Sequence, residues 1–314
     1  MRSKISHIEI YVRLMWLLCF YLSAHLLQGQ TYSNDTLPEN DKTMAFQSII
    51  QTLAHDSMGG RYPGSVYEIK TIDFLKEHLS NCVENDYTLN TDTFTYCCRN
   101  DSNVTAHNFW VWPKQSSKKI IILAAHYDHL PPNSIYSKEI WHKNEIHPGA
   151  DDNASGVAMA ISLFKHFYIK KQDFDVALVL FSGHEEGLHG SKYWLEKHTN
   201  LSDSIIIMLN FDMLGRFSEE THIVSIRTDE NNMFMTHIKE VASKSNIKVN
   251  INIDSFIDTD SYIFYKHNIP SLTVSTGIHN DYHRISDTPD KINYKGMLII
   301  YNFLMDFINN FLNN

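Results

Sequence analysis

The sequence predicts an α/β protein with a mostly parallel central sheet, and two observations support this fold class. From about residue 119 onward, short apolar runs typical of strands alternate with longer stretches typical of helices. This alternation is characteristic of parallel strands that are joined by helical crossovers. The run IIILAA at residues 120–125 has no polar position, which indicates a strand that is buried on both faces of its sheet.

Length and composition indicate one large or two small globular domains. The chain has 314 residues, of which 43% are hydrophobic and 20% are charged, so it can build a packed core. Its formal net charge of −9 argues against a nucleic-acid binder, because such proteins normally present a basic surface. Eighteen histidines in an acidic chain favour a metal site.

Hydrophobic periodicity and the turn residues between apolar runs define the expected elements. Helices are expected at about 42–54, 65–80, 154–169, 188–198 and 232–245, with a last one from about 292. Strands are expected at about 92–96, 104–112, 119–125, 176–182, 204–211, 222–227 and 272–275. Residues 131–147 have no clear period and should form a surface loop at the rim of a site. No internal repeat or domain boundary is visible, so we expect one catalytic domain.

The N-terminal segment has the pattern of a secretory signal peptide. Basic residues lie within 1–13, an uncharged apolar stretch covers 14–27, and a small residue, Gly29, follows. The apolar stretch is shorter than the roughly 20 residues of a spanning helix, although a retained membrane anchor is the alternative. We therefore expect a signal peptide at 1–29, a polar leader at 30–41 and the catalytic domain at 42–314, in a protein that is secreted or periplasmic.

The cysteines leave two interpretations open. Outside the expected signal peptide the chain has three, Cys82, Cys97 and Cys98. In an oxidising compartment Cys82 could form a disulfide with one of the adjacent pair, and three unpaired thiols are equally compatible with the sequence. No cysteine spacing resembles a thiolate zinc site.

Five short segments place acids and histidines directly after apolar runs or in turns. They are 125–129 (AHYDH), 149–156 (GADDNASG), 183–187 (GHEEG), 210–215 (NFDMLG) and 282–284 (YHR). Strand ends in an α/β fold deliver side chains to a ligand crevice. Each segment alone could consist of exposed turn residues or helix caps, but their joint occurrence in this order favours a metal-dependent catalytic site.

These segments resemble the metal motifs of the M28 family of zinc aminopeptidases, of the secreted bacterial type with a co-catalytic pair of zinc ions. The resemblance runs from about residue 42 to the C-terminus and includes 53–61 (LAHDSMGGR) and 282–290 (YHRISDTPD). It implies a zinc-peptidase fold, which is a three-layer sandwich with a mixed, mainly parallel central sheet flanked by helices.

Carried over by position, the resemblance implies five metal ligands for two zinc ions per chain. His126 and Asp212 would bind one ion, Glu186 and His283 the other, and Asp151 would bridge the two. The residue types support this set independently, because two close dications need an anionic bridge. Nitrogen and oxygen ligands without thiolates suit zinc, and a cluster of carboxylates is tolerable only with cations bound.

The resemblance also implies catalytic and supporting roles. Glu185 would be the general base, and Tyr282 would donate a hydrogen bond to the developing oxyanion unless it is a packing residue. Asp128 would orient the first histidine ligand. A cis peptide bond is expected between Asp151 and Asp152.

Together these points predict a di-zinc exopeptidase that removes N-terminal residues from peptides. The expected partners are peptide substrates, with no nucleic acid and no stable protein partner. A carboxypeptidase or dipeptidase on the same metal centre is the main alternative. A single-zinc glutaminyl cyclase and a non-catalytic binding ectodomain are more distant ones, and the zinc content would separate them.

Overall fold

A computed structural model describes residues 39–80, 83, 86–98, 102–116, 119–142, 144–170 and 173–312, all within the compact unit Pro38–Asn314. The expected signal peptide, most of the polar leader and Cys82 lie outside these residues, so the signal peptide and the disulfide stay predictions. Among the described residues, no helix is both long and apolar enough to cross a membrane.

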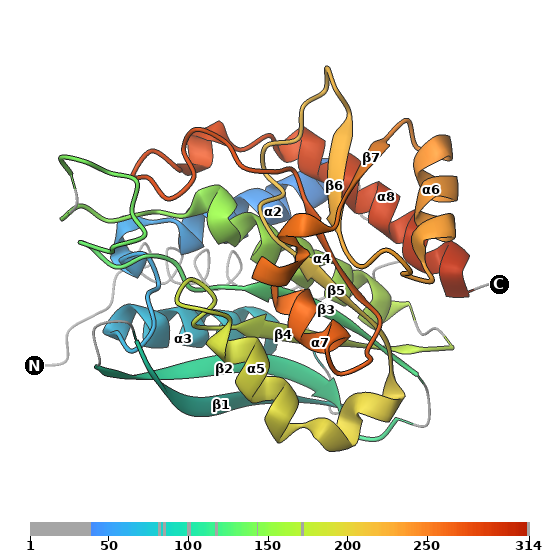
Figure 1. Cartoon of the computed structure of the whole chain (residues 1–314), viewed down its shortest axis with the longest axis horizontal. Coiled ribbons are helices and arrows are strands. Elements are labelled where there is room, and N and C mark those ends of the chain that lie inside the picture. The colour runs from blue at the N-terminus through green and yellow to red at the C-terminus, as the bar shows by residue number, and fades with distance from the viewer. Residues whose placement is uncertain are drawn as a thin grey trace, which may run out of the picture. The chain divides into compact units, whose positions relative to one another are not determined.

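The described strands form an eight-stranded sheet in the order β1-β2-β4-β3-β5-β8-β6-β7 (Figure 1). The strands are β1 (Tyr87–Cys97), β2 (Asn103–Pro113), β3 (Ile120–His126), β4 (Asp175–Phe181), β5 (Ile205–Phe211), β6 (Ile223–Arg227), β7 (Lys248–Asn252) and β8 (Ser271–Ser275). The central four, β4-β3-β5-β8, are parallel, whereas β2 pairs with β4 and β6 with β8 in antiparallel fashion. The sheet is therefore mixed, with a parallel centre, as the sequence predicts.

Helices cover both faces of this sheet (Figure 1). They are α2 (Glu39–Leu53), α3 (Val66–Ser80), α4 (Gly156–Ile169), α5 (His189–Lys197), α6 (Met235–Lys244), α7 (Asp260–Tyr265) and α8 (Tyr294–Leu312). Short helical turns lie at Asp56–Met58, Ala150–Ser155, Thr199–Ser204, Asp254–Asp258 and Pro289–Lys291.

Strand β3 shows why the protein has three layers. Successive side chains of a strand point to opposite faces. Ile121 and Leu123 pack in the core formed with α2, α4 and α8, whereas Ile120 and Ile122 pack in the core formed with α5 and α7. Every residue of β3 is buried, so the continuous apolar run predicts its position correctly.

The expected helices and strands are present, with boundaries that shift by a few residues. Among the described strands, β7, Lys248–Asn252, is the one that the sequence analysis did not predict. Its sequence KVNIN carries only two apolar residues, and it lies at the end of the sheet, where no position is fully buried. An edge strand of this kind has no continuous apolar run by which it could be recognised.

Candidate metal centre

Three neighbouring strands end at one edge of the sheet, and polar residues lie at each end. β3 ends at His126, β5 is followed directly by Asp212, and β4 leads through a short turn to His184 and Glu185. β4, β3 and β5 are parallel neighbours in that order. Because the carboxyl ends of parallel strands meet at one edge, these side chains converge.

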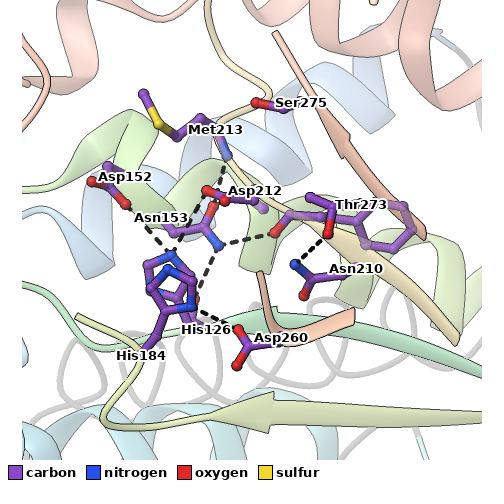
Figure 2. Close-up of polar contacts among 12 residues, drawn as sticks. His126, Asp152, Asn153, His184, Asn210, Asp212, Met213, Asp260, Thr273 and Ser275 are labelled. Carbon is purple, nitrogen blue, oxygen red and sulfur yellow. Dashed lines mark hydrogen bonds and ion pairs between the residues drawn. The ribbon is translucent and has the colours of Figure 1, made fainter. Parts of the chain in front are cut away.

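The carboxylate of Asp152 lies between two pairs of potential ligands. Its Oδ1 is 3.5 Å from Nε2 of His126, and its Oδ2 is 3.3 Å from Nε2 of His283. Nε2 of His126 is 3.8 Å from Oδ1 of Asp212, and Nε2 of His283 is 3.0 Å from Oε2 of Glu185. Figure 2 shows the first pair beside Asp152. A tetrahedral zinc ion with bonds of about 2.0–2.2 Å holds its ligand atoms about 3.4 Å apart, so both groups have suitable spacing.

The two histidines present a lone pair to this cluster. Nδ1 of His126 is 3.2 Å from the carbonyl oxygen of Asp128, and Nδ1 of His283 is 3.0 Å from that of Tyr136. A carbonyl oxygen only accepts, so each Nδ1 donates and each Nε2 is left unprotonated in the neutral ring. Both Nε2 atoms are buried and have no hydrogen-bond partner. This tautomer is the one a metal-binding histidine requires. Asp128 lies beside His126 as predicted, with its Oδ1 at 3.6 Å.

The surroundings of these histidines favour positive charge. Burial lowers the pKa of His283, but the nearby carboxylate of Glu185 outweighs it, and the pKa is raised to about 10. Burial also opposes the charged form of His126, but carboxylates, Asp128 foremost, raise its pKa well above the usual value. Cations would satisfy the same demand, and a set of nitrogen and oxygen donors without thiolates suits zinc.

Asp151 is not among the converging side chains, so it does not fit the predicted role of bridging ligand. Its Oδ1 accepts hydrogen bonds from the backbone N–H of Gly215 at 2.5 Å and from Oγ of Ser155 at 2.9 Å. Its Oδ2 lies 3.0 Å from Nε2 of His279. The carboxylate thus holds the loop after β5 in place.

The predicted cis peptide bond between Asp151 and Asp152 is wrong, because the structure has it between Asp152 and Asn153. The correction to the bridging residue and the correction to the cis peptide bond have one cause. The sequence offers two adjacent aspartates in a turn, and neighbouring side chains there diverge in direction. Composition and spacing cannot decide which of the two faces the centre.

The adjacent glutamates are displaced from their predicted roles in the same way. Glu185, predicted as the general base, has Oε2 beside His283 and Oε1 2.8 Å from Nδ1 of His129. Glu186, predicted as a metal ligand, is not in the cluster, but lines a neighbouring cavity. Glu185 therefore occupies the position expected for the ligand, and His184 precedes it.

His184 was not singled out by the sequence analysis, although it lies within one of the motifs. Its ring stacks on that of His126, with centroids 3.8 Å apart and planes 5° apart (Figure 2). Its Nδ1 is 2.8 Å from Oδ2 of Asp260, the first residue of α7. The buried carboxylate of Asp260 therefore holds the ring of His184 in place.

The side chain of Asn153 ties the metal-site strands together. Its amide nitrogen donates to the carbonyl oxygens of His126 at 3.2 Å and Phe211 at 2.9 Å, which end β3 and β5. Its oxygen accepts from the backbone N–H groups of Gly156 and Met213, both at 3.1 Å. Asn153 is fully buried, so the glycosylation sequence that begins here is not accessible in the folded chain.

Arg61 is fully buried and holds together backbone segments that carry residues of the centre. Its guanidinium donates to four backbone carbonyl groups at 2.7–3.0 Å, those of Leu53, Tyr127, Pro148 and Gly149. One of these follows His126 directly, and two others precede the aspartate pair. The sequence marks Arg61 only as part of a motif, because an arginine by itself suggests a surface position.

Tyr282 and the loop 131–142 surround His283. The ring of Tyr282 stacks on the imidazole at a centroid distance of 3.8 Å, and its role toward an oxyanion stays a prediction. In the loop, the backbone N–H of Lys138 donates to the carbonyl oxygen of His283 at 3.0 Å. Nη1 of Arg284 donates to the carbonyl oxygen of Lys138 at 2.7 Å. The loop thus borders the site, as expected, and is joined to a candidate ligand.

A cavity of about 220 Å³ opens beside Glu185. Aromatic side chains, Tyr62, Tyr96 and Tyr136, form part of its wall, together with Glu186. Oε2 of Glu186 is buried and has no hydrogen-bond partner. Burial, and then the nearby Glu186 carboxylate, raise the pKa of Tyr96. The cavity therefore combines apolar surface with an acidic wall next to the metal centre.

The family of this chain follows from a direct match. The sequence model of Peptidase family M28 matches residues 109–308, so the chain belongs to this family of zinc peptidases. A probable zinc metalloprotease of Pyrenophora teres f. teres is 31% identical over 112 residues, which are 34% of this chain and 23% of that relative.

Two solved structures share the fold. BSAP, a zinc aminopeptidase from Bacillus subtilis, has a TM-score of 0.73 at 13% identity, with 88% of this chain and 97% of that chain covered. A glutaminyl cyclase of Fimbriiglobus ruber has a TM-score of 0.70 at 20% identity, with 87% and 96% covered. At these identities the likeness shows the zinc-peptidase fold and does not distinguish between the two activities.

Proposed function

We propose that this chain is a two-zinc exopeptidase in which Asp152 bridges the ions. One ion would be held by His126 and Asp212, and the other by Glu185 and His283. The observation that supports this set is that the two oxygens of Asp152 face two different histidine–carboxylate pairs, at 3.5 and 3.3 Å. In this set, Asp152 and Glu185 take the places of Asp151 and Glu186. The carboxylate of Asp151 contacts Gly215 and Ser155, and Glu186 lines the neighbouring cavity.

Bound zinc would polarise the scissile carbonyl group and lower the pKa of the attacking water. The chain itself contributes orientation, because each histidine is held through its Nδ1 and each strand end through Asn153. Tyr282 remains our candidate for stabilising the developing oxyanion, since it lies beside His283.

We further propose that the substrate enters with a free α-amino group. An ammonium group is best recognised by a carboxylate, and Glu186 offers a buried oxygen without a partner in the cavity wall. A carboxypeptidase would need a cation there for the terminal carboxylate. The described residues that line the cavity include no lysine and no arginine.

A substrate panel tests this proposal with purified protein loaded with zinc. Aminoacyl substrates with a free amine should be hydrolysed, and their N-acetylated counterparts should not. Hydrolysis of N-blocked peptides from the C-terminal end would show a carboxypeptidase instead. Cyclisation of N-terminal glutamine without hydrolysis would show a glutaminyl cyclase.

Glu186→Gln should raise KM for free-amine substrates by about 10-fold or more, because a charge-assisted hydrogen bond contributes roughly 1.5–3 kcal/mol. The zinc content should stay at the wild-type level, since Glu186 lies outside the cluster. The measurement is KM, kcat and zinc stoichiometry, with Glu196→Gln, an exposed residue of α5, as the charge-matched control. Loss of one zinc ion from Glu186→Gln would instead support its sequence-based assignment as a ligand.

We also propose that the protein is exported and that the mature chain begins near Gln30, on the basis of the basic flank and the short apolar stretch. Mass spectrometry of the protein from its native cell checks this. Cytoplasmic protein that retains Met1 would contradict it.

A further inference from the structure

His184 lies next to the proposed metal ligands without sharing their geometry. Its ring and that of His126 are nearly parallel, 5° apart, with centroids 3.8 Å apart. A metal ion bound to an imidazole nitrogen lies close to the plane of that ring. Because the two rings are stacked, His126 and His184 would not both direct a ring nitrogen at one ion.

The protonation of His184 is fixed by Asp260. Its Nδ1 is 2.8 Å from Oδ2 of Asp260, whose side chain is completely buried. An ionised carboxylate only accepts hydrogen bonds, so Nδ1 donates, and in the neutral ring the lone pair is on Nε2. A ring nitrogen of His184 also lies within 4.8 Å of ligand atoms of His126 and Asp212. The imidazole is thus fixed in orientation by Asp260 and can accept a proton at Nε2, at the edge of the proposed metal centre.

The two carboxylates closest in sequence to His184 and His126, those of Glu185 and Asp128, already have partners. Glu185 has one oxygen beside His283 and the other beside His129. Asp128 accepts from the backbone N–H groups of His184 and Glu185, each at 3.3 Å. The sequence analysis names Glu185 as the general base, directly before the ligand Glu186. With Glu185 as the proposed ligand, the residue directly before it is His184.

We propose that His184 is the proton acceptor for the attacking water and that Asp260 positions it. This inference rests on the proposed two-zinc peptidase function. The Nε2 of His184 takes one proton from the water, whose oxygen forms a bond to the carbonyl carbon. The same proton passes to the amine nitrogen when the C–N bond breaks, so that one water yields one acid and one amine.

His184→Gln should lower kcat by about 10²- to 10⁴-fold, which is the usual contribution of general acid–base catalysis. KM should change by no more than a few-fold, and zinc stoichiometry and zinc affinity should equal those of the wild type. His184→Glu should recover part of kcat, because a carboxylate also accepts a proton. His267→Gln, at a histidine just after α7 whose Nδ1 lies 2.9 Å from the backbone carbonyl oxygen of Ile263, is the matched control.

Asp260 is tested by a double-mutant cycle, because a positioning residue can act only through its partner. Asp260→Asn alone should lower kcat with unchanged KM and zinc content, since an amide can donate to Nδ1 and move the proton to Nε2. In the His184→Gln background the same change should have no further effect on kcat. An equal loss of kcat in both backgrounds would show that Asp260 has a structural role, and it would overturn the proposal that Asp260 positions His184.

The outcomes separate this inference from the function on which it rests. If His184→Gln loses a zinc ion, His184 is a ligand, and if its kcat is that of the wild type, it has no catalytic role. Either result overturns the inference. A wild-type protein that binds two zinc ions but hydrolyses no peptide would instead contradict the proposed function.

Discussion

Asp152→Asn should remove both zinc ions and nearly all peptidase activity, whereas the same change at Asp151 should leave two ions bound. The reason is that the two oxygens of Asp152 lie 3.5 and 3.3 Å from Nε2 of His126 and of His283, so in the proposed centre its loss would take one anionic ligand from each ion. We expect zinc affinity to fall by more than about 100-fold, the upper range for residues that only orient a ligand. Elemental analysis after dialysis and zinc titration calorimetry measure this.

The adjacent aspartates make a matched pair, because both are buried and both substitutions remove one charge. In Asp151→Asn the remaining side-chain oxygen can still accept from Gly215, so stability should fall only modestly. If Asp151→Asn lost both ions and Asp152→Asn kept them, the bridge would be Asp151 after all. Loss of a single ion from Asp152→Asn would mean that the ions share no ligand here.

Arg61→Met should lower the free energy of unfolding by about 3–5 kcal/mol, as removal of one partner from a buried charged network commonly does. Four buried carbonyl groups would lose their donor at once. Burial lowers the pKa of Arg61 to about 10 even with Asp152 and Asp128 nearby, so the guanidinium remains charged at neutral pH. Urea denaturation measures the loss.

Arg61→Lys separates charge from geometry. An ammonium group keeps the charge but cannot reproduce the planar donors that reach four carbonyl groups, so this variant should be nearly as unstable as Arg61→Met. Arg284→Met, at a more exposed arginine, is the control. A fully stable Arg61→Lys protein would show that the charge alone matters.

The elements of the fold could be read from the sequence because most of them bury a continuous or periodic apolar face. β3 is the clearest case, since every one of its residues is buried and apolar until His126. β7 could not be predicted, because an edge strand with the sequence KVNIN buries too little.

The predicted ligand set differs by one residue at two positions from the set that we propose. His126, Asp212 and His283 lie in the cluster as expected, and no identical neighbour competes with any of them. The pairs 151–152 and 185–186 each offer two identical carboxylates in a turn. Which one faces the centre depends on backbone direction, and outside regular strands and helices no periodicity reveals that direction.

The loop 131–142 connects the cavity, where we propose that a peptide binds, with His283, which we propose as a zinc ligand. Tyr136 is one of the residues that line the cavity, and its carbonyl oxygen accepts a hydrogen bond from Nδ1 of His283 at 3.0 Å. In the proposed function, a peptide that displaced this loop would therefore alter the orientation of the imidazole that we propose as a zinc ligand. By thermodynamic reciprocity, the factor by which such a peptide changes the affinity for zinc equals the factor by which zinc changes the affinity for the peptide.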